Sequence, residues 1–247
     1  MARHLIDTTD LSIQEIQTLF AQAKKFLMRP ASNSLQDKLI MTCFFENSTR
    51  TRMSFESASL RLGAKLVSLN AQTSSINKNE TTLDTVLNLD AMMPDAIIVR
   101  HQTSGIAKEL STHINASLIN AGDGTNAHPT QSLLDLFTLL QAFDSKDLSG
   151  KTIAIAGDIA HSRVANSNME LLSRFGANII LVAPQYFMPK QNKFDKSNSF
   201  EPIINDLDVI ISLRAQLERH KDTFEQTNLT ITKTLLGERD IKILHPG

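Results

Sequence analysis

Short hydrophobic segments alternate with longer amphipathic segments along most of the chain. Six mostly apolar segments have the length of strands that are buried on both faces. These segments are 38–45, 65–69, 95–100, 116–120, 151–157 and 177–183. Between them, apolar residues recur at the three- and four-residue spacing of a helix, as at Phe55, Ala58 and Leu62. Strands separated by helices predict an α/β fold, in which parallel sheets are flanked by helices on both sides.

Single residues mark where some helices begin and end. Pro129 suits the first residue of a helix, while Gly63 and Gly176 fall where two other helices are expected to stop. The segment 191–199, QNKFDKSNS, is polar throughout and predicts a surface loop. An apolar segment just before Arg214 predicts one more strand.

A polar junction divides the chain into two predicted domains. Residues 143–150, FDSKDLSG, separate a helical pattern from a new strand. We therefore predict two three-layer α/β domains, residues 1–145 and 146–247. The chain has 247 residues, of which 41% are hydrophobic, so it can form a packed core in one or two domains.

Charge and cysteine content limit the classes of partner. The 25 Lys and Arg residues nearly balance the 26 Asp and Glu residues, so no basic field favours nucleic acid. The single Cys43 excludes an intramolecular disulfide and a structural zinc site, which favours a reducing cytoplasm. The chain starts without a signal-peptide pattern and lacks an apolar run near the ~18 residues of a membrane span. We therefore expect a cytoplasmic protein without a membrane segment.

The segment FFENSTRTRMSFE is the first candidate for chemistry. A helix is predicted to begin within Ser48–Thr51, directly after a buried strand. Its free backbone N–H groups, two hydroxyl groups and the Arg50 guanidinium suit a phosphate group. The alternative is an ordinary Ser/Thr N-cap with exposed arginines. Arg52 is expected to pair with Glu46 or Glu56 and to stabilise the turn.

Two further segments place polar residues beside strand or helix ends. His128 and Gln131 bracket the first turn of the helix that Pro129 begins, and both side chains are expected to face one cleft. A histidine at a helix N-terminus is held neutral and donates a hydrogen bond to a carbonyl oxygen, although such residues also serve as simple caps. Arg100 and His101 lie at the carboxyl end of a strand, where ligands of parallel sheets bind.

The second half of the chain carries arginines just past two strands. Arg163 and Arg214 suit a dicarboxylate, because each guanidinium binds a carboxylate through two parallel hydrogen bonds. The polar loop that contains Ser74 and Lys78 reads by itself as a solvated loop. The sequence contains none of the patterns G-x-x-x-x-G-K-[ST], G-x-G-x-x-G, H-E-x-x-H and G-x-S-x-G, so the nucleotide, zinc-protease and serine-hydrolase classes are not indicated.

In series, the segments FFENSTRTR, HPTQSLLDLF, GDIAHSRV and LRAQLER resemble the aspartate carbamoyltransferase family over the length of the chain. The resemblance implies a carbamoyl-phosphate domain followed by an aspartate domain, in a homotrimer with active sites between neighbouring subunits. Association with a regulatory chain or with dihydroorotase is left open. The implied reaction transfers the carbamoyl group of carbamoyl phosphate to the α-amine of L-aspartate in pyrimidine biosynthesis, without a cofactor or a metal.

The resemblance also assigns roles to single residues. The implied carbamoyl-phosphate contacts are Ser48, Thr49, Arg50, Thr51, Arg100, His128 and Gln131. Three of these would surround the carbamoyl oxygen and act in catalysis: Arg50, Thr51 and His128. Ser74 and Lys78 would reach the site of the neighbouring subunit. The implied aspartate contacts are Lys78, Arg163, Arg214 and Gln216.

Two alternatives and three departures accompany this resemblance. Ornithine carbamoyltransferases share the Ser-Thr-Arg-Thr-Arg cradle, but usually carry His-Cys-Leu-Pro where this chain has His-Pro-Gly, and LRAQLER favours aspartate. The other alternative is a non-catalytic paralogue or fragment that binds a phosphorylated ligand or a protein partner. Asn79 and Gln102 replace the glycine and the proline usual in the family. Family members also continue beyond the position of Gly247 through a loop and closing helices, so we expect an incomplete aspartate domain.

Overall fold

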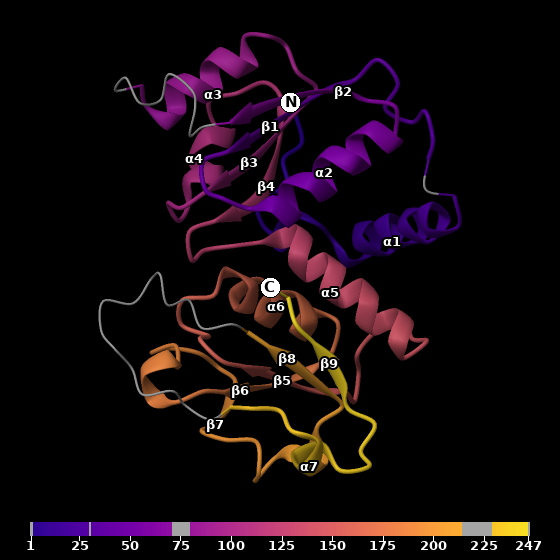
Figure 1. Cartoon of the computed structure of the whole chain (residues 1–247), viewed down its shortest axis with the longest axis vertical. Coiled ribbons are helices and arrows are strands. Elements are labelled where there is room, and N and C mark those ends of the chain that lie inside the picture. The colour runs from indigo at the N-terminus through magenta and orange to yellow at the C-terminus, as the bar shows by residue number, and fades with distance from the viewer. Residues whose placement is uncertain (1, 30, 71–79, 214–228, 247) are drawn as a thin grey trace. The chain divides into compact units, whose positions relative to one another are not determined.

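The computed structural model describes residues 2–29, 31–70, 80–213 and 229–246. The chain divides into two compact units, residues 1–130 and 131–247, and each is described by itself (Figure 1). The division falls in the first turn of helix α5 (Pro129–Ala142), whereas the sequence pattern places the junction after this helix. In the described part of the chain, every helix is too short or too polar to cross a bilayer.

The first unit contains a four-stranded parallel sheet in the order β2-β1-β3-β4. Its strands are β1 (Leu39–Phe44), β2 (Lys65–Asn70), β3 (Ala96–His101) and β4 (Ser117–Asp123). In the register, Cys43 lies opposite Leu69 on one side and Val99 on the other. The first four predicted strands are confirmed, and parallel pairing brings their carboxyl ends to one edge.

Helices cover both faces of this sheet. They are α1 (Ile13–Met28), α2 (Thr49–Arg61), α3 (Thr82–Asp90) and α4 (Ile106–Ser111), after a short 3₁₀ helix at Thr8–Asp10. Met41 and Cys43 of β1 pack in one apolar cluster with Val86 of α3 and Leu110 of α4. The alternate β1 residues Ile40 and Phe44 belong to a second cluster, against which Phe55 of α2 packs. Burial on both faces explains why the strand pattern is continuously hydrophobic.

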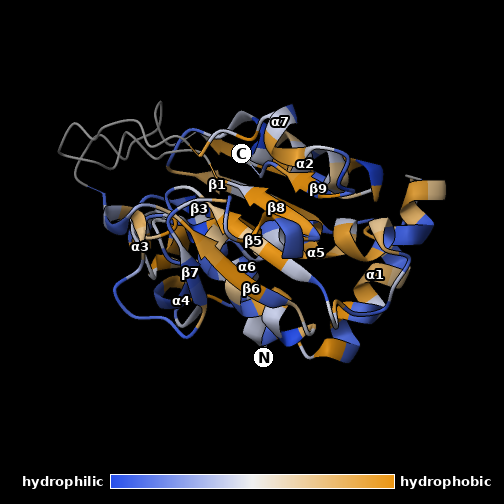
Figure 2. Cartoon of the chain, turned by 90° about the horizontal axis from the view of Figure 1, so that it is seen from below, coloured by the Kyte–Doolittle hydropathy of each residue, from blue (hydrophilic) through white to orange (hydrophobic). Residues whose placement is uncertain are grey.

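The second unit contains a five-stranded parallel sheet in the order β7-β6-β5-β8-β9. Its strands are β5 (Thr152–Ala156), β6 (Asn178–Val182), β7 (Asp195–Ser197), β8 (Val209–Ser212) and β9 (Lys242–Leu244). Helix α6 (Arg163–Arg174) connects β5 to β6, and α7 (Lys233–Leu236) precedes β9. Short 3₁₀ helices lie at Gln185–Phe187 and Ile204–Asp206. Strands β5, β6 and β8 are hydrophobic along most of their length (Figure 2), which confirms the strands predicted there.

The prediction of a loop over residues 191–199 is wrong in its centre. Asp195–Ser197 forms the edge strand β7, which pairs with Ile180–Val182 of β6. Because β7 is three residues long and lies at a sheet edge, its side chains stay polar and exposed and carry no hydrophobic pattern. Strand β9 is equally short and was not predicted from the sequence.

The predicted helix boundaries are confirmed where single residues mark them. Helix α2 begins directly after Ser48, and α5 begins at Pro129. Gly63 and Gly176 follow the ends of α2 and α6 with φ angles of 85° and 88°, a left-handed conformation that glycine adopts without strain.

Candidate active site

Arg100 connects three segments at the carboxyl edge of the first sheet. Its guanidinium pairs with Glu46 Oε1 at 2.7 Å and donates from Nη1 to the carbonyl oxygen of Ala121 at 3.2 Å. The same nitrogen lies 3.4 Å from Thr51 Oγ1 in the first turn of α2. The side chains of Arg100 and Glu46 are 13% and 20% exposed, so the pair is shielded from solvent. The end of β1, the start of α2 and β4 are thus held around one cation.

The N-terminus of α2 lacks the usual side-chain cap. Ser48 occupies the N-cap position, yet its hydroxyl accepts no backbone hydrogen bond. At three other helices, Ser12, Thr81 and Ser162 each accept a backbone N–H in the first turn. The alternative interpretation of Ser48 as an ordinary cap is therefore wrong. The first N–H groups of α2 keep their capacity to bind an anion.

The two arginines of the first turn of α2 have different surroundings. Arg52 lies 3.7 Å from Glu56 Oε1, an oxygen that also accepts hydrogen bonds from Thr42 and Ser68. The predicted structural pairing of Arg52 is confirmed with Glu56, because Glu46 pairs with Arg100 instead. Arg50 is exposed and forms no hydrogen bond or ion pair with the part of the chain that the structure describes. Its guanidinium is thus available to a ligand.

His101 joins the end of β3 to the start of α3. The Thr103 backbone N–H donates to His101 Nδ1 at 2.9 Å, so this nitrogen is the acceptor and Nε2 carries the hydrogen. Nε2 then donates to Thr82 Oγ1 at 3.1 Å. Burial lowers the pKa of His101, and the Phe45 ring lies 4.9 Å from its ring centre. The neutral ring therefore serves as a fixed link between β3 and the first residue of α3.

Asp123 organises the turn that precedes His128. Its carboxylate is 1% exposed and accepts hydrogen bonds from the backbone N–H groups of Gly105 at 2.8 Å and Ala127 at 3.1 Å. Gly124 has φ of 50°, and a Cβ atom there would clash with the side chain and backbone of Ser104, so only glycine fits. His128 follows this turn in a buried position. The predicted position of His128 at the N-terminus of α5 is confirmed.

In the second unit, Gln131 lies in a buried polar cluster. Gln131 Nε2 donates to Asp135 Oδ1 at 2.8 Å, one helical turn away on α5. Asn168 of α6 donates from Nδ2 to the other carboxylate oxygen, also at 2.8 Å. Asp135 is 4% exposed, and burial raises its pKa to about 6. The carboxylate thus has two amide donors but lies in surroundings that disfavour its charge.

Arg163 is the first residue of α6, past the carboxyl end of β5, as the sequence predicts. Its side chain is buried, and Ser162 caps the helix by accepting the Ala165 N–H at 3.2 Å. Near this helix start, Asp158 Oδ1 lies 2.8 Å from Nδ1 of His161. Four predicted site residues lie outside the described residues, namely Ser74, Lys78, Arg214 and Gln216.

Three carboxylates of the site were not assigned a site role from the sequence. The sequence predicts Glu46 only as a partner of Arg52, although its place directly after β1 is a usable signal. Asp135 follows Gln131 by four residues, the spacing at which helical side chains meet. Asp123 accepts the Gly105 N–H from a distant loop, a contact that no local pattern indicates.

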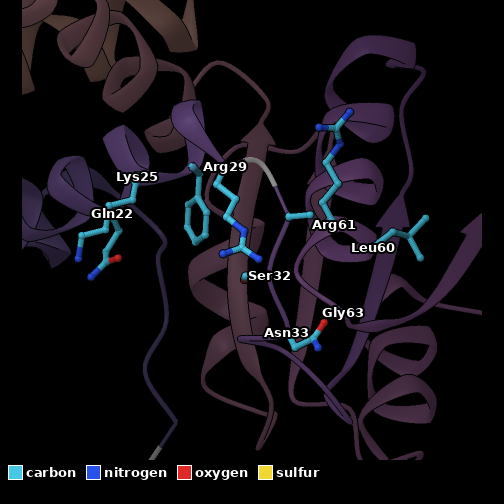
Figure 3. A pocket seen from close by; sticks show the side chains of 10 residues that line it. Gln22, Lys25, Arg29, Ser32, Asn33, Leu60, Arg61 and Gly63 are labelled. Atoms are coloured by element: carbon cyan, nitrogen blue, oxygen red, sulfur yellow. The ribbon is translucent and has the colours of Figure 1, made fainter.

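A hollow elsewhere in the first unit is lined by arginine and lysine side chains that do not point to one common position. It has a volume of about 720 Å³ and lies at the ends of α1 and α2. Figure 3 shows the guanidinium of Arg29 directed toward Ser32, whereas that of Arg61 points away from it. The predicted site residues in the described part of the chain are absent from its lining. The strand ends described above therefore remain the better candidate.

Comparisons with known proteins agree on one family. Residues 3–141 match the family model described as aspartate/ornithine carbamoyltransferase, carbamoyl-P binding domain. The aspartate carbamoyltransferase catalytic subunit of Sulfurimonas denitrificans is 55% identical over 251 aligned positions, which cover 99% of this chain and 85% of that protein. That of Nitratiruptor sp. is 54% identical and is covered over 86% of its length.

Solved structures of the same family share the fold. Aspartate transcarbamoylase from Trypanosoma cruzi, in complex with carbamoyl aspartate and phosphate, matches with a TM-score of 0.90 at 28% identity, over 100% of this chain and 84% of that chain. The catalytic subunit from M. jannaschii matches with a TM-score of 0.86 at 32% identity, over 99% and 86%. The chain therefore belongs to the aspartate/ornithine carbamoyltransferase family, among the aspartate carbamoyltransferase catalytic subunits.

Proposed function

We propose that this protein transfers the carbamoyl group of carbamoyl phosphate to the α-amine of L-aspartate. The products are N-carbamoyl-L-aspartate and phosphate, as in pyrimidine biosynthesis. Similarity to aspartate carbamoyltransferase catalytic subunits over nearly the whole chain supports this activity. The T. cruzi neighbour is solved in complex with carbamoyl phosphate and aspartate.

One observation carries the proposal, namely the uncapped N-terminus of α2. A dianionic acyl phosphate needs hydrogen-bond donors and positive charge in one place. The first turn of α2 offers backbone N–H groups, a Ser48 hydroxyl that caps no N–H, and the exposed Arg50. Arg100 lies against the same turn through Thr51.

Ser48, Thr49, Arg50 and Thr51 are proposed to bind the phosphate, with Arg100, His128 and Gln131 as further contacts to carbamoyl phosphate. The α-amine attacks the carbamoyl carbon, and a tetrahedral oxyanion forms before phosphate leaves. Arg50, Thr51 and His128 are proposed to donate hydrogen bonds to this oxygen, which stabilises the charge that develops on it. For this role His128 needs only to donate one ring N–H hydrogen bond, without transferring a proton.

L-Aspartate carries two carboxylates and needs its own cations. We assign this role to Arg163, Arg214, Gln216 and Lys78, with Ser74 and Lys78 contributed by a neighbouring subunit. The position of Arg163 at the start of α6, past the carboxyl end of β5, supports its part in this set, because ligands of open parallel sheets bind at this edge.

The domain roles are proposed as carbamoyl-phosphate binding for residues 1–145 and aspartate binding for residues 146–247. The family model, which ends at residue 141, supports the first of these. We further propose a cytoplasmic homotrimer. A regulatory chain or dihydroorotase is a candidate for additional assembly, which size measurements of the purified protein alone and with each partner would test.

A colorimetric assay for carbamoyl amino acids tests the proposed activity. The purified chain is incubated with carbamoyl phosphate and either L-aspartate or L-ornithine. We expect product with aspartate at a rate at least 100-fold above that with ornithine, on the order of the discrimination that a charge-specific site achieves. Product from ornithine alone would assign the chain to the ornithine branch. Absence of product from both amino acids would favour the non-catalytic alternative.

A further inference from the structure

One of the two polar atoms of the Gln131 side-chain amide forms a hydrogen bond within the described residues. Its Nε2 donates to Asp135 Oδ1 at 2.8 Å, and both residues lie on α5. In the part of the chain that the structure describes, Gln131 Oε1 accepts no hydrogen bond. An amide whose nitrogen is bound presents its oxygen on the other side. Gln131 is therefore oriented to accept a hydrogen bond from a further group.

Asp135 is itself held in place from a second helix. Asn168 of α6 donates from Nδ2 to Asp135 Oδ2 at 2.8 Å, and Asn168 is fully buried. With a donor on each oxygen, the carboxylate has one fixed orientation. Side chains that are held on regular helices by such partners position a binding group more accurately than loops do.

We infer that Asp135 is a positioning residue that orients the Gln131 amide as an acceptor, so that the site prefers an acyl phosphate carrying an N–H group. This inference rests on the proposed function. The carbamoyl group ends in NH₂, which donates to an acceptor. The acetyl group of acetyl phosphate has nearly the same shape but ends in a methyl group. A Gln131 oxygen directed at this position distinguishes the two through a single hydrogen bond.

The need for a hydrogen-bond acceptor explains why a polar side chain is kept in this buried place. A buried carboxylate without a cation costs free energy, and Asp135 forms no ion pair within the described residues. Burial raises its pKa to about 6, which shows that its surroundings do not favour the charge. The two carboxylate oxygens of Asp135 accept hydrogen bonds from the side-chain amides of Gln131 and Asn168. An apolar residue of the same size cannot accept them.

Binding of carbamoyl phosphate and of acetyl phosphate to the full chain, measured by calorimetry, tests the inference. In the wild type we expect carbamoyl phosphate to bind at least about tenfold more tightly, the effect of one hydrogen bond. Asp135→Leu has the branched outline of aspartate but no acceptor, and it should reduce this preference to about threefold or less. Asp135→Asn should retain it, because the oxygen of the introduced amide still accepts from Gln131 while its NH₂ turns to Asn168 Oδ1, which has no partner among the described residues.

A double-variant comparison separates positioning from general stability. Gln131→Ala should lose the preference, and adding Asp135→Leu to it should cause no further loss. Ser173→Ala on α6 removes hydrogen bonds to Met169 and Glu170, remote from Gln131, and should leave the preference unchanged. If Asp135→Leu does not fold, Asp135→Ala takes its place.

The outcomes distinguish this inference from the proposed function. An unchanged preference in folded Asp135→Leu or Asp135→Ala overturns the role of Asp135 and leaves the activity standing. A further loss when the two changes are combined also contradicts it. A wild-type chain that binds neither acyl phosphate overturns the proposed function and this inference together.

Discussion

Two carboxylates hold the side chains that we propose to contact carbamoyl phosphate. Glu46 binds Arg100 at 2.7 Å, and Asp135 binds Gln131 at 2.8 Å. Both contacted side chains are long, and each loses rotamer freedom when it is fixed. Because the carboxylates fix them before a ligand arrives, less of this entropy is lost on binding. Arg50 has no such partner in the described part of the chain, so binding must order it.

Arg50→Ala and His128→Ala are expected to lower turnover, Arg50→Ala the more severely. Removing one donor to a developing oxyanion typically slows the reaction on the order of a hundredfold or more, and Arg50→Ala also removes a charge that binds phosphate. Steady-state kinetics with both substrates measure the effect. Arg3→Ala serves as the control, because Arg3 is an exposed arginine that pairs with Glu15. Turnover near the wild-type value in Arg50→Ala would refute the assignment.

Asp135→Asn is expected to change how stability depends on pH. The pKa of Asp135 is about 6 in the folded chain, against a reference of 3.8, so between these values the folded state binds more protons than the unfolded state. The free energy of unfolding therefore falls as pH rises through this window. At pH 7.5 Asp135→Asn should be more stable than the wild type by about 3 kcal/mol.

Urea unfolding of both proteins at several pH values measures this difference. The advantage of Asp135→Asn should shrink as pH falls from 6 toward 4, where the folded state is protonated, and should vanish below about 3, where Asp135 is protonated in both states. A stability difference that does not vary with pH would show that burial does not raise the pKa of Asp135.

At the level of elements, the helix N-termini fall into two kinds. Ser12 and Thr81 form reciprocal capping boxes with Glu15 and Asp84, so α1 and α3 begin with satisfied N–H groups. Helix α2 begins with a serine that satisfies none of them. A capped terminus contributes to stability, whereas an uncapped one keeps its donors for a ligand. The sequence S-T-R at the start of α2 thus resembles a cap, although its serine satisfies no first-turn N–H group.

Ser12→Ala and Ser48→Ala should therefore affect different properties, the first the stability of the fold and the second the binding of carbamoyl phosphate. Ser12→Ala removes a cap and should lower the free energy of unfolding by about 1 kcal/mol, with little change in ligand binding. Ser48→Ala should change stability by less than about 0.5 kcal/mol, but weaken carbamoyl phosphate binding about tenfold. Denaturant unfolding and calorimetry on the same samples test both statements. A stability loss in Ser48→Ala equal to that in Ser12→Ala would restore the interpretation of Ser48 as a cap.

At the level of the whole molecule, each unit is a parallel sheet with a candidate binding residue past a strand end. Arg100 lies at the carboxyl end of β3 in the first unit, and Arg163 follows β5 in the second. Ligands of open parallel sheets bind at this edge. Because the net charge of the chain is only −1, local cations of this kind, and not the overall charge, must attract the two anionic substrates.

Mixing two inactive variants tests whether Lys78 acts in a neighbouring subunit. Arg50→Ala and Lys78→Ala chains, dissociated and reassembled together, should regain about a quarter of the wild-type activity, since random assembly restores one site in four. Arg50→Ala mixed with His128→Ala should regain none, because both residues are proposed to serve the site of the same chain. If trimers that contain both Arg50→Ala and Lys78→Ala chains form but regain no activity, the proposed role of Lys78 is contradicted.

Much of the fold could be predicted from the sequence because its signals are local. The strand β1 and the start of α2 follow from hydrophobic runs and from the residues that border a helix. The edge strand β7 could not be predicted, since a three-residue strand with exposed side chains has no hydrophobic period. The partner of Arg100 was also missed, because Glu46 lies 54 residues away along the chain and the contact depends on strand pairing.

The sequence by itself determined the order of strands and helices, the position of the candidate phosphate site at the start of α2, and the family. Hydrophobic periodicity, the residues that mark helix ends and sequence motifs are all properties of residues that are close together in the chain. Only the tertiary structure decided which strands are neighbours, that Ser48 does not cap α2, and that Asp135 binds both Gln131 and Asn168. The physical reason is that hydropathy indicates whether a residue is buried, while its partner depends on how distant segments pack. Asn168 and Asp135 meet because α5 and α6 bring their side chains together, and no local pattern encodes that contact.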